Sequence, residues 1–464
     1  MTTPSNWILH LGLGSFHRAH QALYLQWLHE QGDHDWALAG GNIRPDMAEL
    51  IEALQAQQGR YTLETVTPQG ERAYQTIASI QHVISWDAQH SGLKAVAADP
   101  ATKIISFTVT EAGYYLDTQD RLDLSYPDLA SDVAGTTCCT IYGVLQALLD
   151  ARRAANAGPV TLLNCDNLRA NGDRFNEGFK QFLALCGNAD LLHWVVANTC
   201  TPNSMVDRIT PRPSPEVAER VKAATGVEDK AALMSESFIQ WVIEDHFVAG
   251  RPNWQNVGAE LVDDVMPYEE AKIRILNATH SCIAWAGTLA GYSFIHEGTL
   301  DPEIRQFGYD YVSDDVIPVL SPSPLDLEQY RDVVLERFGN DNVLDTNGRV
   351  AMDGYSKLPG FIVPTIRDNL ERGESFDAVA MLPAFFLAFL IVQQRGEIPY
   401  PYEDQIMPAE SAQRIVNAAD PVAEFCSERL LFNDLAGNPI LLASIRKAFA
   451  RVQNFQKTRG IFKA

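Results

Sequence analysis

The stretch PYEEAKIRILNATH, residues 267–280, carries polar side chains that could together form a site. If the stretch is helical, at about 100° per residue, four of them share one arc. They are Glu269, Lys272, Asn277 and His280. A lysine can act as a general base towards a hydroxyl, and amides can donate hydrogen bonds to the developing oxyanion. The alternative is a solvated polar face, which is common on surface helices.

A second stretch, HLGLGSFHRAH at residues 10–20, has the pattern of a loop that binds a dinucleotide. An apolar run precedes it and a helical pattern follows it. Gly12 permits a tight turn, and Gly14 lets a pyrophosphate approach the backbone. The third glycine of the usual pattern is replaced by His17, and Arg18 adds a cation that could contact phosphate. From these residues alone, a turn that binds nothing is an equal alternative.

The stretch AGGNIRPD bears on the choice of cofactor because an acidic residue after the second strand would bind the adenosine ribose. Asn42 stands near the expected position, and Asp46 comes slightly later. This weakly favours NAD. Arg44 could instead support the 2′-phosphate of NADP.

Two other classes of dehydrogenase fit the sequence less well. The spacing Tyr268-x-x-x-Lys272 occurs in short-chain dehydrogenases, but there the pair lies much nearer the glycine loop. Gln255 also stands where those enzymes have a serine. The second class, the zinc-dependent alcohol dehydrogenases, is excluded because the clusters of cysteine and histidine ligands are missing. The seven cysteines form no CxxC pair, so we expect neither a cysteine zinc site nor a disulfide framework.

The predicted secondary structure that positions these residues changes along the chain. Up to about residue 265, short apolar runs, including one at 192–200 interpreted as a strand, alternate with helical stretches. This alternation predicts a mostly parallel sheet with helices on both faces. Helical periodicity dominates afterwards. We therefore predict an α/β dinucleotide-binding domain of Rossmann type at residues 1–265. A mainly α-helical substrate and catalytic domain should follow at residues 266–464.

Charge and hydropathy limit the partners and the location. The net charge of −23, from 59 acidic and 36 basic residues, makes nucleic acid an unlikely partner on electrostatic grounds. The N-terminus has no basic or long apolar segment, so we expect no signal peptide. The longest apolar run, 378–392, is shorter than the ~20 residues that span a bilayer. Because Pro383 also interrupts it, we predict a buried helix and a cytoplasmic protein.

Six blocks of the chain together resemble a known family. In order they are GLGSFHRAHQA, TVTEAGYY, NCDN, PNSMVDRITP, KIRILNATHS and RVAMDGYSKLPGFIVPTIR. They are similar to the signature blocks of the polyol-specific long-chain dehydrogenases, the mannitol dehydrogenase family, over nearly the whole chain. The cofactor loop of that family has histidine at its third position. The resemblance therefore favours a cofactor loop, with His17 as an expected residue, over an empty turn.

The resemblance implies a role for each residue of the site. Lys272 is the expected base, and Asn167 and Asn277 are expected to polarise the substrate oxygen. His280 would hold the same oxygen or orient the lysine, and Glu269 would relay the proton to solvent. Two further residues, Arg349 and Lys357, are expected to bind the other substrate hydroxyls. The expected cofactor-binding residues are Gly12, Gly14, Phe16, His17, Arg18, Asn42, Glu111 and Asp207.

The activity that the resemblance implies is the NAD-dependent, metal-independent oxidation of an open-chain polyol to a ketose. D-arabinitol, giving D-xylulose, is the expected substrate, and D-mannitol, giving D-fructose, is the alternative. The expected partners are these small molecules only, with no nucleic acid and no membrane, and the expected state is a monomer. A non-catalytic dinucleotide-binding protein is the competing class, but it would not need the lysine, both asparagines and the histidine.

Overall fold

The computed structural model describes residues 4–109, 111–117 and 120–462, and the chain divides into two compact units. The first comprises Met1–Thr67 and Glu71–Met266, and the second comprises Pro68–Gly70 and Pro267–Ala464. The boundary predicted between residues 265 and 266 lies one residue from this division. The turn at 68–70, which groups with the second unit, was not expected from the sequence.

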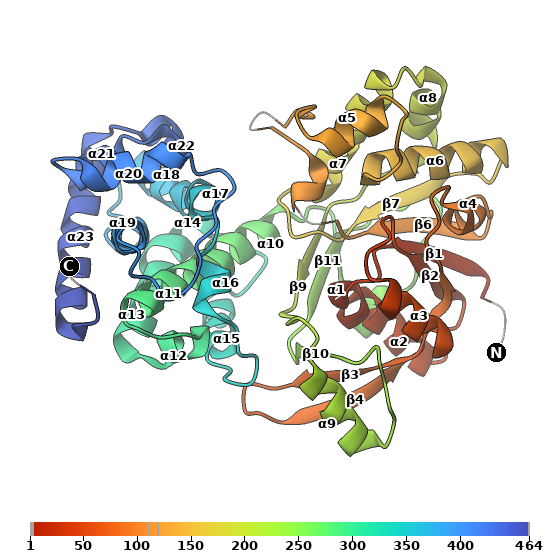
Figure 1. Ribbon diagram of the computed structural model, residues 1–464, viewed down its shortest axis with the longest axis horizontal. Coiled ribbons are helices and arrows are strands. Elements are labelled where there is room, and N and C mark those ends of the chain that lie inside the picture. The colour runs from red at the N-terminus through yellow and green to blue at the C-terminus, as the bar shows by residue number, and fades with distance from the viewer. Residues whose placement is uncertain (1–3, 110, 118–119, 463–464) are drawn as a thin grey trace. The chain divides into compact units, whose positions relative to one another are not determined.

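The first unit is built on a parallel sheet of six strands, with helices on both faces (Figure 1). In spatial order the strands are β5 (Ile80–Ile84), β2 (Trp36–Gly41), β1 (Asn6–Leu11), β6 (Thr102–Phe107), β7 (Val160–Asn164) and β8 (Thr199–Cys200). This is the strand order of dinucleotide-binding domains, in which ligands bind at the carboxyl ends of the strands where the order reverses. The predicted α/β, Rossmann-type class is confirmed, and the reversal lies between β1 and β6.

Both faces of the sheet are buried, which explains why its strands are almost continuously apolar. Ile8 and Leu163 pack on one face, and Leu9 and Phe107 pack on the other. The first face is covered by α2 (Gln21–Glu30) and α3 (Ala48–Ala56). The second is covered by α4 (Ser91–Ala97), α6 (Ile141–Ala154) and α7 (Asn171–Leu185).

The strand predicted at residues 192–200 is wrong. Residues Ala189–Asn198 form helix α8, and only Thr199–Cys200 join the sheet as β8. Asn188 caps the helix by accepting the N–H of Leu191 at 3.2 Å. Leu191 and Val195, four residues apart, supply the buried stripe that a helix needs.

Two small sheets complete the first unit. One consists of β10 (Leu233–Glu236), β3 (Tyr61–Val66) and β4 (Arg72–Ile77). The other consists of β12 (Glu260–Val262), β11 (Gln240–Glu244) and β9 (Ser204–Asp207). Each contains one antiparallel pair of strands, which the alternating pattern of the sequence did not predict.

The second unit is helical, as predicted, around the apolar helix α19 (Met381–Gln394). Every residue from 381 to 390 is buried, which confirms the prediction of a core helix. Pro383 does not interrupt the helix, because it lies in the first turn, where an N–H has no helical partner. Among the described residues, no helix is both long and apolar enough to cross a membrane.

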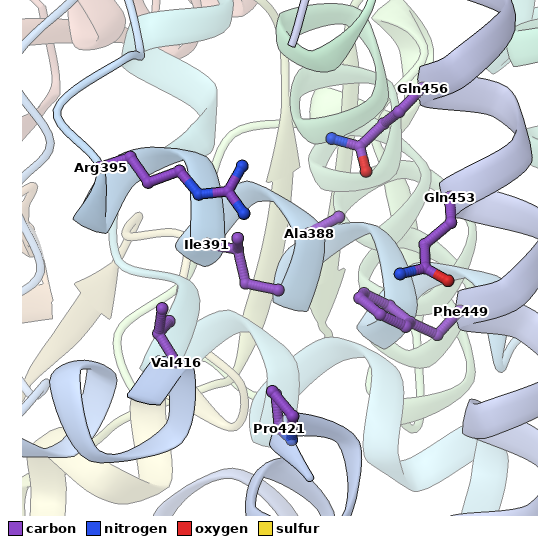
Figure 2. A pocket seen from close by; sticks show the side chains of 8 residues that line it. All are labelled: Ala388, Ile391, Arg395, Val416, Pro421, Phe449, Gln453 and Gln456. Atoms are coloured by element: carbon purple, nitrogen blue, oxygen red, sulfur yellow. The ribbon is translucent and has the colours of Figure 1, made fainter. Parts of the chain in front are cut away.

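A cavity of about 250 Å³ lies beside α19 in the second unit (Figure 2). Ala388, Ile391, Val416, Pro421 and Phe449 supply apolar atoms to it, and Arg395, Gln453 and Gln456 supply polar ones. None of the residues predicted to bind cofactor or substrate lines this cavity.

Candidate active site

The glycine loop joins β1 to the short helix α1 (Ser15–Ala19). Gly12 has a φ of +108°, and a Cβ there would lie 3.0 Å from the carbonyl oxygen of Thr108, so this position requires glycine. Gly14 has an ordinary φ of −68°, and a Cβ there would meet no atom within 4 Å. The backbone at Gly14 therefore faces open space, as the approach of a pyrophosphate requires.

Asn42 holds this loop in place. Its Oδ1 accepts the N–H of Leu13 at 2.9 Å, and its Nδ2 donates to the carbonyl of Asp46 at 3.4 Å. Only 6% of Asn42 is exposed. The structure thus places Asn42 directly after β2, at the predicted position, and shows a contact with the glycine loop that the sequence analysis did not predict.

His17 fills the space beneath the loop. Its ring stacks on that of His10 with 3.4 Å between the centroids, and its Nδ1 lies 3.2 Å from Oε1 of Gln21. Nδ1 of His10 lies 2.8 Å from Oγ of Ser106 on β6. Burial lowers the pKa of both imidazoles, that of His10 to about 3, so the stacked rings are neutral at physiological pH. Stacking therefore replaces the close helix–strand contact that a third glycine normally permits.

Arg18 departs from the expectation that it contacts phosphate. Only 1% of the residue is exposed, and its guanidinium donates to the carbonyl of Ala231 at 2.5 Å. The guanidinium also lies over the ring of Tyr61, 5.2 Å from the centroid. We therefore correct this expectation, because the structure turns the cation into the protein interior. Phe16, two residues before Arg18 in α1, stacks on His20 with 5.0 Å between the ring centroids.

Two further residues were predicted to bind the cofactor. Asp207 ends β9 and is buried, whereas the side chain of Glu111 lies outside the described residues. Arg44, the alternative contact for a 2′-phosphate, donates to Oδ2 of Asp128 and to the hydroxyl of Tyr115, both at 2.9 Å. The guanidinium of Arg44 is thus already engaged by protein groups.

The NCDN block, residues 164–167 at the end of β7, exposes one polar side chain and buries two. Asp166 accepts the N–H of Val109 at 2.8 Å and the hydroxyl of Tyr114 at 3.0 Å. Asn164 accepts the N–H of Asp166 at 2.8 Å. These bonds hold the carboxyl ends of β6 and β7 together and leave Asn167 exposed, three residues beyond β7. Asn167 was predicted from the sequence, but the supporting roles of its neighbours were not.

The helix that carries the predicted base contains a π turn, which the sequence analysis missed. Lys272–Asn277 form this turn between α10 (Met266–Ala271) and α11 (Ala278–Leu289). A π turn bonds residue i to residue i+5, so Lys272 and Asn277 lie one turn apart. At about 100° per residue they would lie ~140° apart in an α-helix. With Glu269 three residues before and His280 three residues after, the turn aligns all four on one face.

This face is not a solvated surface, so the alternative raised from the sequence is wrong. Only 6% of Lys272 and 5% of Glu269 are exposed. Arg274 pairs with Glu270 at 2.6 Å and also with Asp368. The hydroxyl of Tyr311 donates to the carbonyl of Arg274 at 2.7 Å, which gives a backbone oxygen of the π turn a partner.

Two predicted residues of the second unit contact Asp345, a carboxylate that was not predicted from the sequence. Nε2 of His280 lies 3.3 Å from Oδ2 of Asp345, and the guanidinium of Arg349 donates to both carboxylate oxygens, at 2.6 and 2.5 Å. Lys357 donates to the carbonyl of Val350 at 2.7 Å, and burial lowers its pKa to about 8. The i, i+4 spacing of Asp345 and Arg349 was the available signal in the sequence.

Comparison with known proteins covers almost all of the chain. The model of the mannitol dehydrogenase Rossmann domain matches residues 6–256, and that of the mannitol dehydrogenase C-terminal domain matches 264–453. The chain is 60% identical to D-arabinitol 4-dehydrogenase of Ralstonia nicotianae, over 97% of each chain. It is 52% identical to D-arabinitol 4-dehydrogenase of Klebsiella pneumoniae, over 97% of this chain and 99% of that one.

A solved structure is also similar. The ternary complex of Pseudomonas fluorescens mannitol 2-dehydrogenase with NAD and D-mannitol has a TM-score of 0.84 to this chain and 33% sequence identity. The match covers 98% of this chain and 94% of that one.

Proposed function

Because this chain belongs to the mannitol dehydrogenase family and is an oxidoreductase acting on CH–OH groups, we propose that it oxidises a secondary alcohol of an open-chain polyol to a ketose with NAD. The proposed pair is D-arabinitol and D-xylulose, which the names of its two D-arabinitol 4-dehydrogenase relatives support. The structural observation that carries the proposal is the buried face of Lys272, which the π turn aligns with Asn277 and His280.

NAD fits the residues of the first unit. The positive φ of Gly12 and the open space at Gly14 form a backbone loop that a pyrophosphate can approach, and Asn42 holds that loop. When bound, the nicotinamide accepts the hydride from the carbinol carbon. The NAD complex of the related mannitol 2-dehydrogenase supports NAD as the cofactor.

The protein's own groups handle the proton and the charge. Nζ of Lys272 takes the proton of the reacting hydroxyl. The side-chain amides of Asn167 and Asn277 are proposed to donate hydrogen bonds to the oxygen as it gains negative charge. Glu269, three residues before the lysine on the same helical face, passes the proton towards solvent. The cations of Arg349 and Lys357 donate to the other hydroxyls of the polyol.

Steady-state oxidation of D-arabinitol, D-mannitol, D-sorbitol and xylitol, each with NAD and NADP, tests the proposal. We expect the highest kcat/KM for D-arabinitol with NAD. A higher value for D-mannitol would favour the mannitol 2-dehydrogenase alternative. NADH binding without turnover of any of the four polyols would contradict the proposal and favour a non-catalytic protein. Action as a metal-independent, cytoplasmic monomer stays a prediction from the sequence.

A further inference from the structure

The carboxylate of Asp345 lies between two side chains assigned to the substrate. Oδ2 is 3.3 Å from Nε2 of His280, and both oxygens accept hydrogen bonds from Arg349. Only 9% of the Asp345 side chain is exposed. A surface ion pair contributes little to stability. The buried carboxylate of Asp345 can instead hold its two partners in a fixed orientation.

The chain around Asp345 is held from several directions. Its carbonyl accepts the N–H of Ile295 at 2.9 Å, and Thr346 forms a bridge with Phe294. Oγ1 of Thr346 then caps α16 (Asn347–Ala351) by accepting the N–H of Arg349 at 3.2 Å. These bonds fix the backbone on both sides of the carboxylate, so its position does not depend on a bound substrate.

This geometry selects one tautomer of His280. An ionised carboxylate only accepts hydrogen bonds, and the neighbouring cation and histidine hold the pKa of Asp345 well below its usual range. Nε2 approaches Oδ2 to 3.3 Å, and a lone pair on Nε2 would be repelled by the carboxylate, so the ring proton is favoured on Nε2. Burial lowers the pKa of His280, so the ring is neutral and Nδ1 keeps its lone pair. Phe338 stacks on the ring at 4.4 Å and restricts its rotation.

We propose that Asp345 is a positioning residue that fixes His280 as a hydrogen-bond acceptor towards the polyol and holds Arg349 as a donor beside it. An acceptor nitrogen cannot stabilise an alkoxide, so stabilisation of the developing charge falls to the two asparagines. His280 instead accepts from a hydroxyl that keeps its proton, or from the ammonium of Lys272. The inference rests on the proposed function for the identity of the substrate, but the tautomer itself does not.

The tautomer is measured by 15N NMR of the imidazole in the full-length enzyme, with His280→Gln used to assign the signal. We expect Nε2–H in the wild type. Because the Asp345 carboxylate raises the pKa of His280, Asp345→Asn should lower that pKa further. The other charged groups near His280 and Asp345 remain unchanged in the variant; they are Arg349, Lys357, Asp353 and Asp404. A wild-type Nδ1–H tautomer, or a pKa unmoved by Asp345→Asn, would overturn the proposal.

Kinetics provide the second test. Asp345→Asn should lower kcat/KM roughly 10–100-fold, as loss of a residue that orients a functional histidine does at metal sites. In a His280→Ala background the same change should cost clearly less than in the wild type, because only the part that acts through Arg349 remains. The full loss in that background would overturn the proposal. Asp377→Asn, which removes a surface pair with Lys447, is the matched control and should leave kcat/KM unchanged.

These two tests separate the inference from the proposed function. If the wild type oxidises no polyol, the proposed function fails, while the NMR measurement still decides the role of Asp345. If the wild type is active and the tautomer is Nδ1–H, the proposed function stands and the inference about Asp345 fails.

Discussion

The side chains of the second unit differ in solvent exposure, and exposure determines which chemical role each can take. Lys272 is buried on the face that the π turn forms, whereas the side chain of Arg349 is 64% exposed and is held by a carboxylate. A buried amine suits proton transfer, because bulk water cannot compete for the proton. A guanidinium with free N–H groups suits recognition of hydroxyls.

Replacement of Lys272 by alanine should remove most activity in both directions, because the proton of the reacting hydroxyl then has no acceptor. It should also abolish the rise of kcat/KM with pH that deprotonation of a lysine base produces. Small primary amines should restore part of the rate by entering the vacated space. Steady-state pH profiles of the wild type and Lys272→Ala measure all three effects. A variant with near-wild-type activity and an unchanged profile would exclude Lys272 as the base.

Lys357 should make polyol binding depend on pH. Burial lowers its pKa to about 8, so the ammonium, with three donors, is present below this pH and is lost above it. The KM for the polyol should therefore rise as pH increases through about 8. In Lys357→Met the KM should be high at every pH and should lack this increase. An unchanged KM in the variant would show that Lys357 does not bind the substrate.

At the scale of secondary structure, irregular backbone rather than ideal helix or strand creates the functional positions. The loop after β1 depends on the positive φ of Gly12, and the lysine face depends on the π turn at Lys272–Asn277. The His10–His17 stack supports the first of these, and the hydroxyl of Tyr311 supports the second. Each irregular segment is thus stabilised by buried side chains from its surroundings.

Gly14→Val should block NADH binding while the protein remains folded. The φ of −68° and the empty space around the Cβ position allow a side chain here, and that side chain would occupy the approach of the pyrophosphate. Titration of NADH fluorescence measures the affinity. Gly12→Val is the contrasting variant, and it should destabilise the fold, because of the positive φ and the 3.0 Å contact with Thr108. Unchanged NADH affinity in a folded Gly14→Val protein would refute the assignment of the loop.

For the molecule as a whole, each unit has its own apolar core, and the second is built on α19. Asp315 is buried in this unit and accepts the N–H of Val379 at 2.6 Å, just before α19 begins. Burial raises the pKa of Asp315 to about 6. The folded state therefore holds this proton more tightly than the unfolded state does. Its contribution to stability is present at low pH and is lost as pH rises from the unfolded pKa, about 3.9, through the folded one.

Asp315→Asn should accordingly stabilise the protein above pH 6, because an amide cannot carry the buried charge. We expect an increase of roughly 1 kcal/mol in the free energy of unfolding at pH 8 and no increase near pH 4. Urea denaturation at the two pH values measures this difference. A variant less stable than the wild type at pH 8 would show that the hydrogen bond to Val379 needs the ionised carboxylate.

The sequence alone determined the features that depend on neighbours along the chain. The alternation of short apolar runs with helical stretches predicted the parallel sheet. The uniformly apolar run at 378–392 predicted a core helix. Both predictions succeeded because local periodicity reflects which faces are buried. The glycine loop and the spacing of the polar residues around Lys272 were likewise visible. Their interpretation as a cofactor loop and a catalytic helix depended on resemblance to a family.

The packing of distant segments determines which side chains turn inward and which partners they contact. Arg18 bonds to Ala231, more than 200 residues away, and His280 meets Asp345 across 65 residues, contacts that no local pattern encodes. The π turn at Lys272–Asn277 receives a hydrogen bond from Tyr311, a residue of another helical segment. Such pairings depend on how distant segments pack, because burial removes the water that would otherwise satisfy each polar group.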